Sequence, residues 1–350
     1  MKKHRLGSYP VYLLFVTVGV LVAGSVAPVA AETGYHIIKK IPVGGEGFWD
    51  YLVVDSEARR LYISRSTHVM VLDPDTGSTV GDILNTEGVH GIALVPEFGR
   101  GFTSNGRSDS VTIFDLKTLK ETGRVNTTGQ NPDAIIYDPA SRRVFTFNGR
   151  GGNSTAIDAA TGKVAGSVDL GGRPEFAAAD GKGKVYVNLE DKSMVVAFDS
   201  QQLKVESRWP LAPCEEPSGM ALDREHRRLF IGCHNQMMAV MDADSGHVLA
   251  TLPIGRGVDA NAYDPETGFA FSSNGDGTLT VVHEDSPSQF SVVDNVSTQR
   301  GARTLALDLK THNVFLVTAE FGPPSAATPE QPRPRPSIVP GSFTVLVVGK

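Results

Sequence analysis

Residues 91–125 read GIALVPEFGRGFTSNGRSDSVTIFDLKTLKETGRV, and this stretch contains four short apolar runs separated by turn-forming residues. The runs lie at 91–95, 101–104, 110–114 and 121–125. Each has the length of a β-strand, and the connections are rich in Gly, Ser, Asn and Asp, which favour tight turns. The stretch therefore predicts a small antiparallel sheet of four strands.

The same unit recurs along the chain at intervals of 41 to 44 residues. The end of the first run is marked in each unit by Asp55, Pro96, Asp138, Asp180, Asp223, Asp264 or Asp308. The end of the third run is marked by Asp73, Asp115, Asp158, Asp199, Asp242 or His283. Four strands per unit at this period are typical of β-propeller blades. Seven first-run markers predict an all-β, seven-bladed β-propeller with four antiparallel strands per blade.

The ends of the chain predict how the ring closes. The last unit stops at 342–350, which supplies a third strand but no fourth, and an extra apolar run lies at 35–43, before the first unit. If the N-terminal run completes the last blade, no open sheet edge remains between the first and last blades. We therefore expect one propeller domain at 32–350.

The first 31 residues have the order of a secretory signal peptide. Three positive charges among the first five residues precede an apolar run at 11–23, and small residues follow at 29–31. The apolar run is shorter than the roughly 20 residues of a membrane span. We expect cleavage near residue 31, a periplasmic or secreted protein, and no integral membrane association after cleavage.

Charge and cysteine content limit the function classes. Without the leader the chain has 30 Lys and Arg against 39 Asp and Glu, a net charge of −9, which argues against nucleic-acid binding. The two cysteines, Cys214 and Cys233, are expected to form a disulfide after export. Free thiols, or a metal held with His234, are the alternatives.

The repeats resemble those of the YVTN-type, YncE-like family of exported seven-bladed propellers, over essentially the whole mature chain. The resemblance rests on DPxTG-like turns at 73–77 and 264–268, SNG turns at 104–106 and 273–275, and the blade-start prolines Pro132, Pro174 and Pro217. The YVTN tetrapeptide itself is absent, and YVN at 186–188 is the nearest match. The resemblance implies the fold and export, and it assigns no activity.

One column of residues, five positions before the first-run markers, is expected to ring the axis. It holds Asp50, Gly91, Asp133, Glu175, Ser218, Asp259 and Arg303, with Trp49, His90 and Asn261 close by in the sequence. These residues predict a polar axial pocket for a divalent cation, a cationic group or a polyhydroxyl compound. The alternative is that they cap the blade starts or line a water-filled channel.

The connections between second and third strands face the same side of the ring. They carry Arg65, Asn105, Asn148, His234 and Asn274. We interpret most of the Asn-Gly pairs as hairpin turns that need positive φ, whereas His234 is expected at the pocket rim beside the disulfide. The opposite face, with repeated turns at 138–143 and 223–228, is expected to be solvated scaffold.

A proline-rich insertion at 320–341 interrupts the last unit. Prolines at this density favour stiff extended segments. The insertion is expected to cover the channel mouth as a lid that brings Arg333 and Arg335 toward the acids, to dock another protein, or to remain a mobile excursion.

Two functions fit the sequence. The first is a monomeric exported scaffold, without catalysis or cofactor, that binds a small-molecule ligand or a partner protein at its acidic axial face. The second is a calcium-dependent hydrolase or lyase of the lactonase type. Its metal shell would be Asp50, Asp133, Glu175, Asp259, Asn148 and Asn274, with His90 as the acid–base group. No GxSxG, HExxH or haem-attachment motif is present, and we prefer the scaffold.

Overall fold

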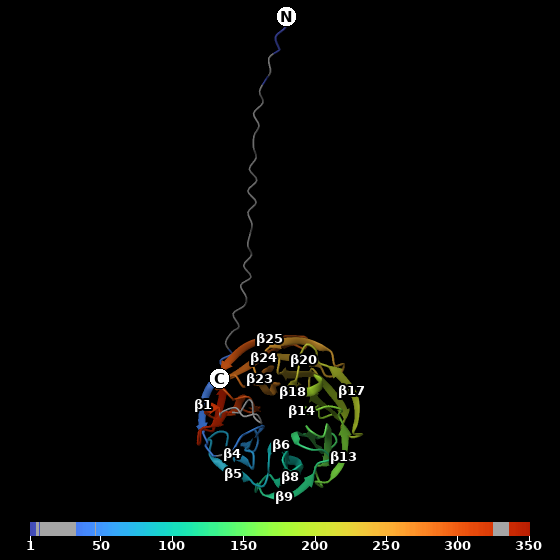
Figure 1. Cartoon of the computed structure of the whole chain (residues 1–350), viewed down its shortest axis with the longest axis vertical. Coiled ribbons are helices and arrows are strands. Elements are labelled where there is room, and N and C mark those ends of the chain that lie inside the picture. Colours follow the sequence, from blue (N-terminus) through green and yellow to red (C-terminus); the bar gives the residue numbers. More distant parts are fainter. Residues whose placement is uncertain (5–6, 8–32, 46, 325–335) are drawn as a thin grey trace. The chain divides into compact units, whose positions relative to one another are not determined.

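The computed structural model describes residues 1–4, 7, 33–45, 47–324 and 336–350. The chain divides into two units, Met1–Ala30 and Ala31–Lys350. The large unit confirms the predicted fold: seven sheets of four antiparallel strands are arranged around a common axis (Figure 1). Most of the expected signal peptide lies outside the described residues. Among the described residues, no helix is long and apolar enough to span a membrane.

Each of the first six blades is a continuous run of four strands. Blade 1 consists of β2 (Leu52–Asp55), β3 (Arg60–Ser64), β4 (Val69–Leu72) and β5 (Thr79–Ile83). Blade 2 consists of β6 (Val89–Val95), β7 (Arg100–Asn105), β8 (Ser110–Asp115) and β9 (Glu121–Asn126). Blade 3 consists of β10 (Pro132–Asp138), β11 (Arg143–Asn148), β12 (Asn153–Asp158) and β13 (Val164–Asp169). Blade 4 consists of β14 (Pro174–Ala179), β15 (Lys184–Leu189), β16 (Met194–Asp199) and β17 (Lys204–Pro210). Blade 5 consists of β18 (Pro217–Asp223), β19 (Arg228–Cys233), β20 (Met237–Asp242) and β21 (Val248–Pro253). Blade 6 consists of β22 (Val258–Asp264), β23 (Phe269–Asn274), β24 (Thr278–Ser286) and β25 (Gln289–Ser297). Two short 3-10 turns, η1 (Pro96–Phe98) and η2 (Glu190–Lys192), are inserted between strands.

The seventh blade joins the two ends of the domain. Its order is β26 (Leu305–Asp308), β27 (Asn313–Thr318), β30 (Thr344–Gly349) and β1 (His36–Pro42). Strand β1 pairs antiparallel with β30 from His36 opposite Gly349 to Pro42 opposite Thr344. The predicted closure is therefore confirmed, and the backbone hydrogen bonds of this sheet fasten the ring.

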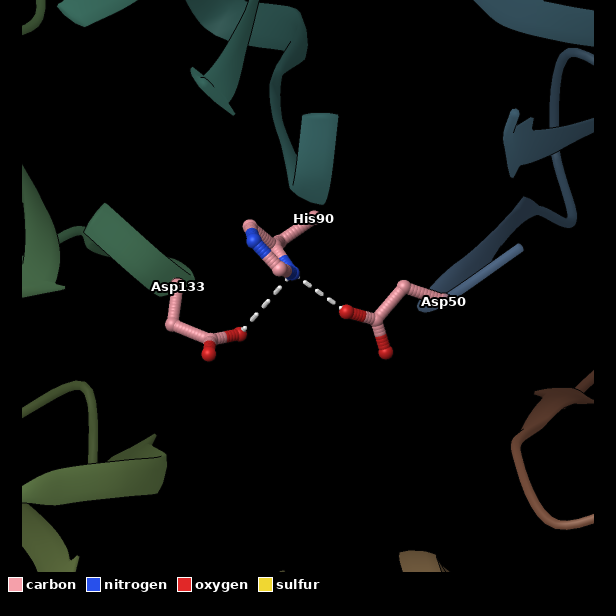
Figure 2. Close-up of side chains that lie close together, drawn as sticks. All are labelled: Asp50, His90 and Asp133. Carbon is pink, nitrogen blue, oxygen red and sulfur yellow. Dashed lines mark hydrogen bonds and ion pairs between the residues drawn. The ribbon is translucent and has the colours of Figure 1, made fainter. Parts of the chain in front are cut away.

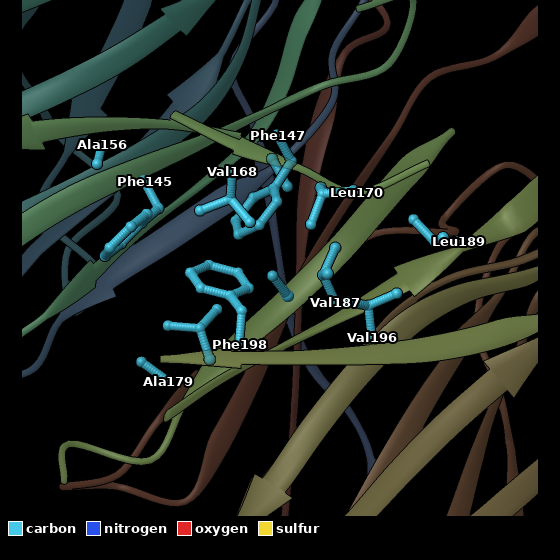
Figure 3. Close-up of a cluster of buried hydrophobic side chains, with 13 residues drawn as sticks. Phe145, Phe147, Ala156, Val168, Leu170, Ala179, Val187, Leu189, Val196 and Phe198 are labelled. Atoms are coloured by element: carbon cyan, nitrogen blue, oxygen red, sulfur yellow. The ribbon is translucent and has the colours of Figure 1, made fainter. Parts of the chain in front are cut away.

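The blades adhere through apolar side chains that fill the space between neighbouring sheets. Figure 3 shows this packing between blades 3 and 4, where Phe145 and Phe147 of β11 meet Val187, Val196 and Phe198 of the next blade. The rings of Phe145 and Phe198 lie 5.4 Å apart in an edge-to-face arrangement. All five side chains are fully buried. The apolar core is therefore divided among the seven interfaces between neighbouring blades.

The aspartates at the ends of third strands form the turns that follow them. Oδ1 of Asp73 accepts the backbone N–H groups of Asp75 and Thr76, at 3.0 and 2.8 Å. Equivalent bonds to main-chain N–H groups form at Asp115, Asp158, Asp199 and Asp242. An aspartate that holds its own turn in this way explains why the marker recurs.

The aspartates at the ends of first strands have a second role that corrects the expectation of a merely solvated face. Asp138, Asp223, Asp264 and Asp308 are buried. Arg59 of blade 1 reaches Asp308 of blade 7 at 2.7 Å, and Nδ1 of His312 in blade 7 lies 2.7 Å from Asp264 of blade 6. These residues therefore connect adjacent blades as well as closing turns.

The proline-rich insertion begins and ends as a small two-stranded sheet. Strands β28 (Phe321–Pro324) and β29 (Pro336–Ile338) pair antiparallel with each other in the part of the chain that connects β27 to β30. Residues 325–335, with Arg333 and Arg335, lie outside the described residues, so the proposed lid and docking roles of that part remain predictions.

Candidate functional site

The column of polar residues lies where the innermost strands begin. In five blades the pairing of the first and second strands shifts register there, for example between Val89 and Ile92 in blade 2 and between Pro132 and Ile135 in blade 3. A bulge of this kind lets one residue leave the pleat and point elsewhere. It gives the column residues a local freedom that a regular strand would not allow.

Hydrogen bonds between blades hold the column in place. Oγ of Ser104, on β7, accepts the N–H of Gly91 at 2.9 Å and donates to the carbonyl oxygen of Asp133 in the next blade. Ser273 makes the corresponding bond to the carbonyl oxygen of Arg303, at 2.5 Å. The serine of each SNG motif therefore positions the column residue of the following blade.

Three residues of the predicted pocket meet in one cluster. Figure 2 shows His90 between Asp50 and Asp133, which come from three successive blades. Nδ1 of His90 lies 2.5 Å from Oδ2 of Asp50 and 3.5 Å from Oδ1 of Asp133. Gly106 lies against the other side of the ring: a Cβ there would approach Nε2 of His90 to 2.7 Å. The glycine of this SNG motif therefore makes room for the imidazole.

The carboxylates around His90 keep it protonated. Burial by itself would lower the pKa of His90, but the hydrogen bond with Asp50 and the charges of Asp133 and Asp259 outweigh it and raise the pKa to about 9. At neutral pH the ring is therefore an imidazolium that offers both N–H groups as donors.

The remaining acids of the column are crowded together. Burial, reinforced by neighbouring carboxylates, raises the pKa of Asp133 to about 7 although His90 opposes the shift, and it raises that of Glu175 well above its usual range. Burial also raises the pKa of Asp259 to about 6, against the opposing effect of Arg303, whose Nε lies 3.6 Å away. The hub therefore concentrates more acid than its cations neutralise.

Sequence reasoning missed Glu190, which follows β15 in blade 4. Its charge contributes to the raised pKa of Asp133, Glu175 and Asp259, so it belongs to the same group of acids. Arg173 approaches it to 2.7 Å. The signal for Glu190 was its loop position, which is equivalent to that of His234 one blade later.

Sequence reasoning also missed an aromatic pair at the axis. The rings of Tyr51 and Phe176 lie 5.2 Å apart, although they belong to blades 1 and 4 on opposite sides of the hub. Burial and the surrounding carboxylates, Asp133 first, raise the pKa of the Tyr51 hydroxyl. Because these residues directly follow Asp50 and Glu175, the pair spans the axis next to the acidic column.

A cavity of about 570 Å³ opens beside this hub. Among the residues that line it are Trp49, Asp50, His90, Arg107, Arg150 and Arg303. A smaller cavity of about 250 Å³ shares Trp49 and Arg303 and is lined by Phe321 and Pro336 of the insertion. The insertion therefore leaves the propeller beside this smaller cavity, on the same face as the other connections between second and third strands.

The asparagines expected in the pocket are buried inside their own blades. The amide nitrogen of Asn148 donates to Asn153 Oδ1 and Thr155 Oγ1, at 2.9 and 3.0 Å, and its oxygen accepts from Thr146. Asn105 and Asn274 make the equivalent bonds. This corrects their assignment to the ligand shell. It also changes the reason for the motif, because the asparagine links the second and third strands and has no positive φ.

Four other expected residues lie away from the cavity. Asn261 is buried with its amide oxygen against Gly219 and Gly232, where a Cβ would come within 2.3 and 2.6 Å. Arg65 is buried too, donates to the carbonyl oxygen of Gly44 and stacks on Phe343. Gly91 and Ser218 of the column offer no charge. We therefore remove Asn261 and Arg65 from the pocket.

The predicted disulfide between Cys214 and Cys233 is confirmed in blade 5. His234 follows it, partly exposed, with Nδ1 at 3.5 Å from Glu216 and 3.9 Å from Glu190. Its charge also acts on Asp259. His234 therefore lies toward the hub on the side opposite His90, as expected from its loop.

The residues expected to hold calcium do not assemble as a shell. Of the six, only Asp50 and Asp133 lie in one cluster whose potential ligand atoms are within 4.8 Å of one another, and the third member is His90. Calcium takes oxygen ligands, whereas an imidazole nitrogen beside two carboxylates suits a transition metal better. The calcium set thus does not fit this geometry.

The fold and this site define a seven-bladed β-propeller with a charged pocket at its axis. No family model matches the chain, and no curated protein matches its sequence. Solved structures do resemble it. One is titled "Crystal Structure of Mitotic Checkpoint Complex", with a TM-score of 0.72, 11% identity and coverage of 99% of both chains. Another contains the WD40 repeats of RRP9, with a TM-score of 0.74, 9% identity and coverage of 91% of this chain and 99% of that one. At such identities the likeness establishes the fold alone.

Proposed function

We propose that this protein is an exported binding scaffold whose ligand or partner occupies the axial face where the column residues meet. The observation that carries the proposal is the cavity of about 570 Å³ beside Asp50 and His90. Cavities of this size, lined by a few polar groups on a rigid frame, are typical of small-molecule sites. The disulfide and the expected signal peptide support export. One of the similar structures is that of a protein complex, which supports a binding role.

A thermal-shift screen of the exported protein against sugars, lactones, peptides and divalent metals tests this proposal. A ligand that binds the folded state raises the melting temperature, and the stabilisation grows with the logarithm of one plus the ratio of the ligand concentration to Kd. The shift should be reduced in Trp49→Ala, which removes a cavity wall, and retained in Trp209→Ala, which alters the other tryptophan, in β17. A ligand whose shift is the same in both variants binds elsewhere, and that result would refute the axial site.

Export has its own test. The full-length chain, expressed in a bacterium, should appear in the periplasm with a new N-terminus near residue 32. An intact N-terminus in the cytoplasm would contradict the expected leader.

A metal-dependent hydrolase is the second candidate, and the Asp50–His90–Asp133 cluster beside the cavity favours it. A bound transition metal would supply an activated water, with these three residues as its ligands. If so, Zn²⁺ or Mn²⁺ should raise the melting temperature of the wild type and leave His90→Ala unchanged. An equal shift in both proteins would reject this candidate without affecting the binding proposal.

A further inference from the structure

The loops between second and third strands differ in charge from blade to blade. The position two residues after the second strand is occupied around the ring by Ser66, Arg107, Arg150, Asp191, Asn235, Asp276 and Glu320. Arginine occurs only in the adjacent blades 2 and 3, each time in the sequence Asn-Gly-Arg, whereas blades 4, 6 and 7 carry acids. One sector of the rim is therefore basic on a chain whose net charge is −6.

The cavity lies in this basic sector. Arg107 and Arg150 both line it and are exposed, and Arg303 lines it from blade 7. Within the part of the chain that the structure describes, the guanidinium groups of Arg107 and Arg150 have no hydrogen bond or ion pair. Among the described residues, Arg303 is paired with Asp259, at 3.6 Å. The guanidinium groups of Arg107 and Arg150 therefore remain available to a molecule in the cavity.

The carboxylates that line the cavity are already engaged. Oδ2 of Asp50 is bound by His90 at 2.5 Å, and Oδ1 of Asp109 accepts the backbone N–H of Asn131 at 2.7 Å. Asp133, Glu175 and Asp259 do not line this cavity. The lining of the cavity has three arginines against two carboxylates, so its net charge is positive, although the column next to it is acidic.

One wall of the cavity is aromatic. Phe48 is half exposed, and Trp49 lines the cavity while its ring rests 5.3 Å from that of Phe343 and 6.2 Å from that of Phe321. A tryptophan supported by two further rings presents a fixed flat surface. Planar or apolar groups stack well on such a surface.

We infer that the axial cavity binds a small molecule with an anionic group, a carboxylate or a phosphate, held by Arg107 and Arg150, and with a flat apolar body against Trp49. Guanidinium groups suit both anions because they donate paired N–H bonds to two oxygens. This inference rests on the proposed binding function and replaces the cationic ligand that the sequence suggested.

Four ligands with the same ring and different charges test the inference by calorimetry on the full mature domain. Benzoate and phenyl phosphate carry the two anions, benzamide is neutral and benzylamine is a cation. We expect binding of at least one anion and no measurable binding of benzamide or benzylamine. Arg107→Gln and Arg150→Gln should each weaken the anion at least tenfold. Arg256→Gln, an exposed arginine of the same face outside the cavity, should leave its Kd unchanged within twofold.

The two anions separate the possible chemistries: preference for benzoate indicates a carboxylate ligand, and preference for phenyl phosphate indicates a phosphate. Three results would overturn the inference: benzylamine binding as tightly as the anions, no anion binding at 10 mM (on the order of the weakest millimolar sites), or equal losses in Arg107→Gln and Arg256→Gln. If a cation or a neutral sugar binds and Trp49→Ala abolishes that binding, the axial function stands and only the anionic chemistry is wrong.

Discussion

We expect the free energy of unfolding to depend on pH, because burial makes the ionised forms of Asp133, Glu175 and Asp259 unfavourable in the folded protein. The pKa of Asp133 rises from 3.8 to about 7 on folding. Between these values the folded protein holds a proton that the unfolded chain has released. Stability is therefore highest below pH 4 with respect to this group and is lost as the pH rises through 7.

The magnitude follows from the same values. A change from 3.8 to about 7 corresponds to about 4 kcal/mol at pH 8, since each pKa unit is worth about 1.36 kcal/mol. Asp133→Asn is neutral at every pH and keeps an oxygen that can accept a bond from His90, which lies 3.5 Å away. The attraction to the imidazolium is already contained in the pKa of about 7, so we expect a net gain of up to about 4 kcal/mol at pH 8.

The pKa of His90 changes stability in the same direction. It rises from 6.5 to about 9, so the stability that the imidazolium provides is complete below pH 6.5 and disappears as the pH passes 9. Urea denaturation at pH 5, 6.5, 8 and 9 should show wild-type stability falling throughout this range and a flatter profile for Asp133→Asn. The exposed Glu57→Gln on the other face serves as the control and should stay within about 0.5 kcal/mol of wild type. A flat wild-type profile, or an Asp133→Asn protein no more stable than wild type at pH 8, would refute this reasoning.

Three further predictions concern the frame around the pocket. Replacing Cys214 and Cys233 by serine should lower the free energy of unfolding by about 3 kcal/mol, measured in urea, because the bridge restricts the unfolded chain; an unchanged midpoint would contradict this. Gly106→Ala should displace the imidazole from its carboxylates and lower the pKa of His90, which NMR titration would record, and an unshifted titration would show that the ring has room to move. Ser104→Ala should destabilise the protein by about 1–2 kcal/mol, because it removes the hydrogen bonds of the serine with Gly91 and Asp133. If thermal unfolding shows no loss of stability, Ser104 does not hold the two blades together.

The fold could be predicted from the sequence because the same pattern of strands and turns is repeated in every blade. Each copy of the blade shows the same alternation and the same turn aspartates, so errors at one strand do not change the period. The strands of blade 2 agree with the predicted runs to within one residue, except that β6 begins two residues earlier, at Val89, and so includes the bulge. The final closure by β1 was also predictable, since the chain had one strand missing at one end and one in excess at the other.

The candidate site was predicted only in part. The column was found by alignment, and two of its members, Asp50 and Asp133, lie in one cluster with His90, which precedes the column in blade 2. The asparagines of the SNG motifs were misplaced, because the sequence does not tell whether a polar side chain turns toward the axis or back into its own sheet. The side chain of Asn148 turns into its own sheet because its amide group forms hydrogen bonds with the buried hydroxyls of Thr146 and Thr155.

The sequence by itself determined the number of blades, the closing strand, the disulfide and the ring of acids, because these depend on periodicity and on residue type. The tertiary structure alone decided which groups face the cavity. Charge at a pocket depends on distances between residues from different blades: Tyr51 and Phe176 meet across the axis, and Arg107 and Arg150 come together at one side of the rim. Those distances are set by how seven sheets pack around a ring, which no single segment of the chain encodes.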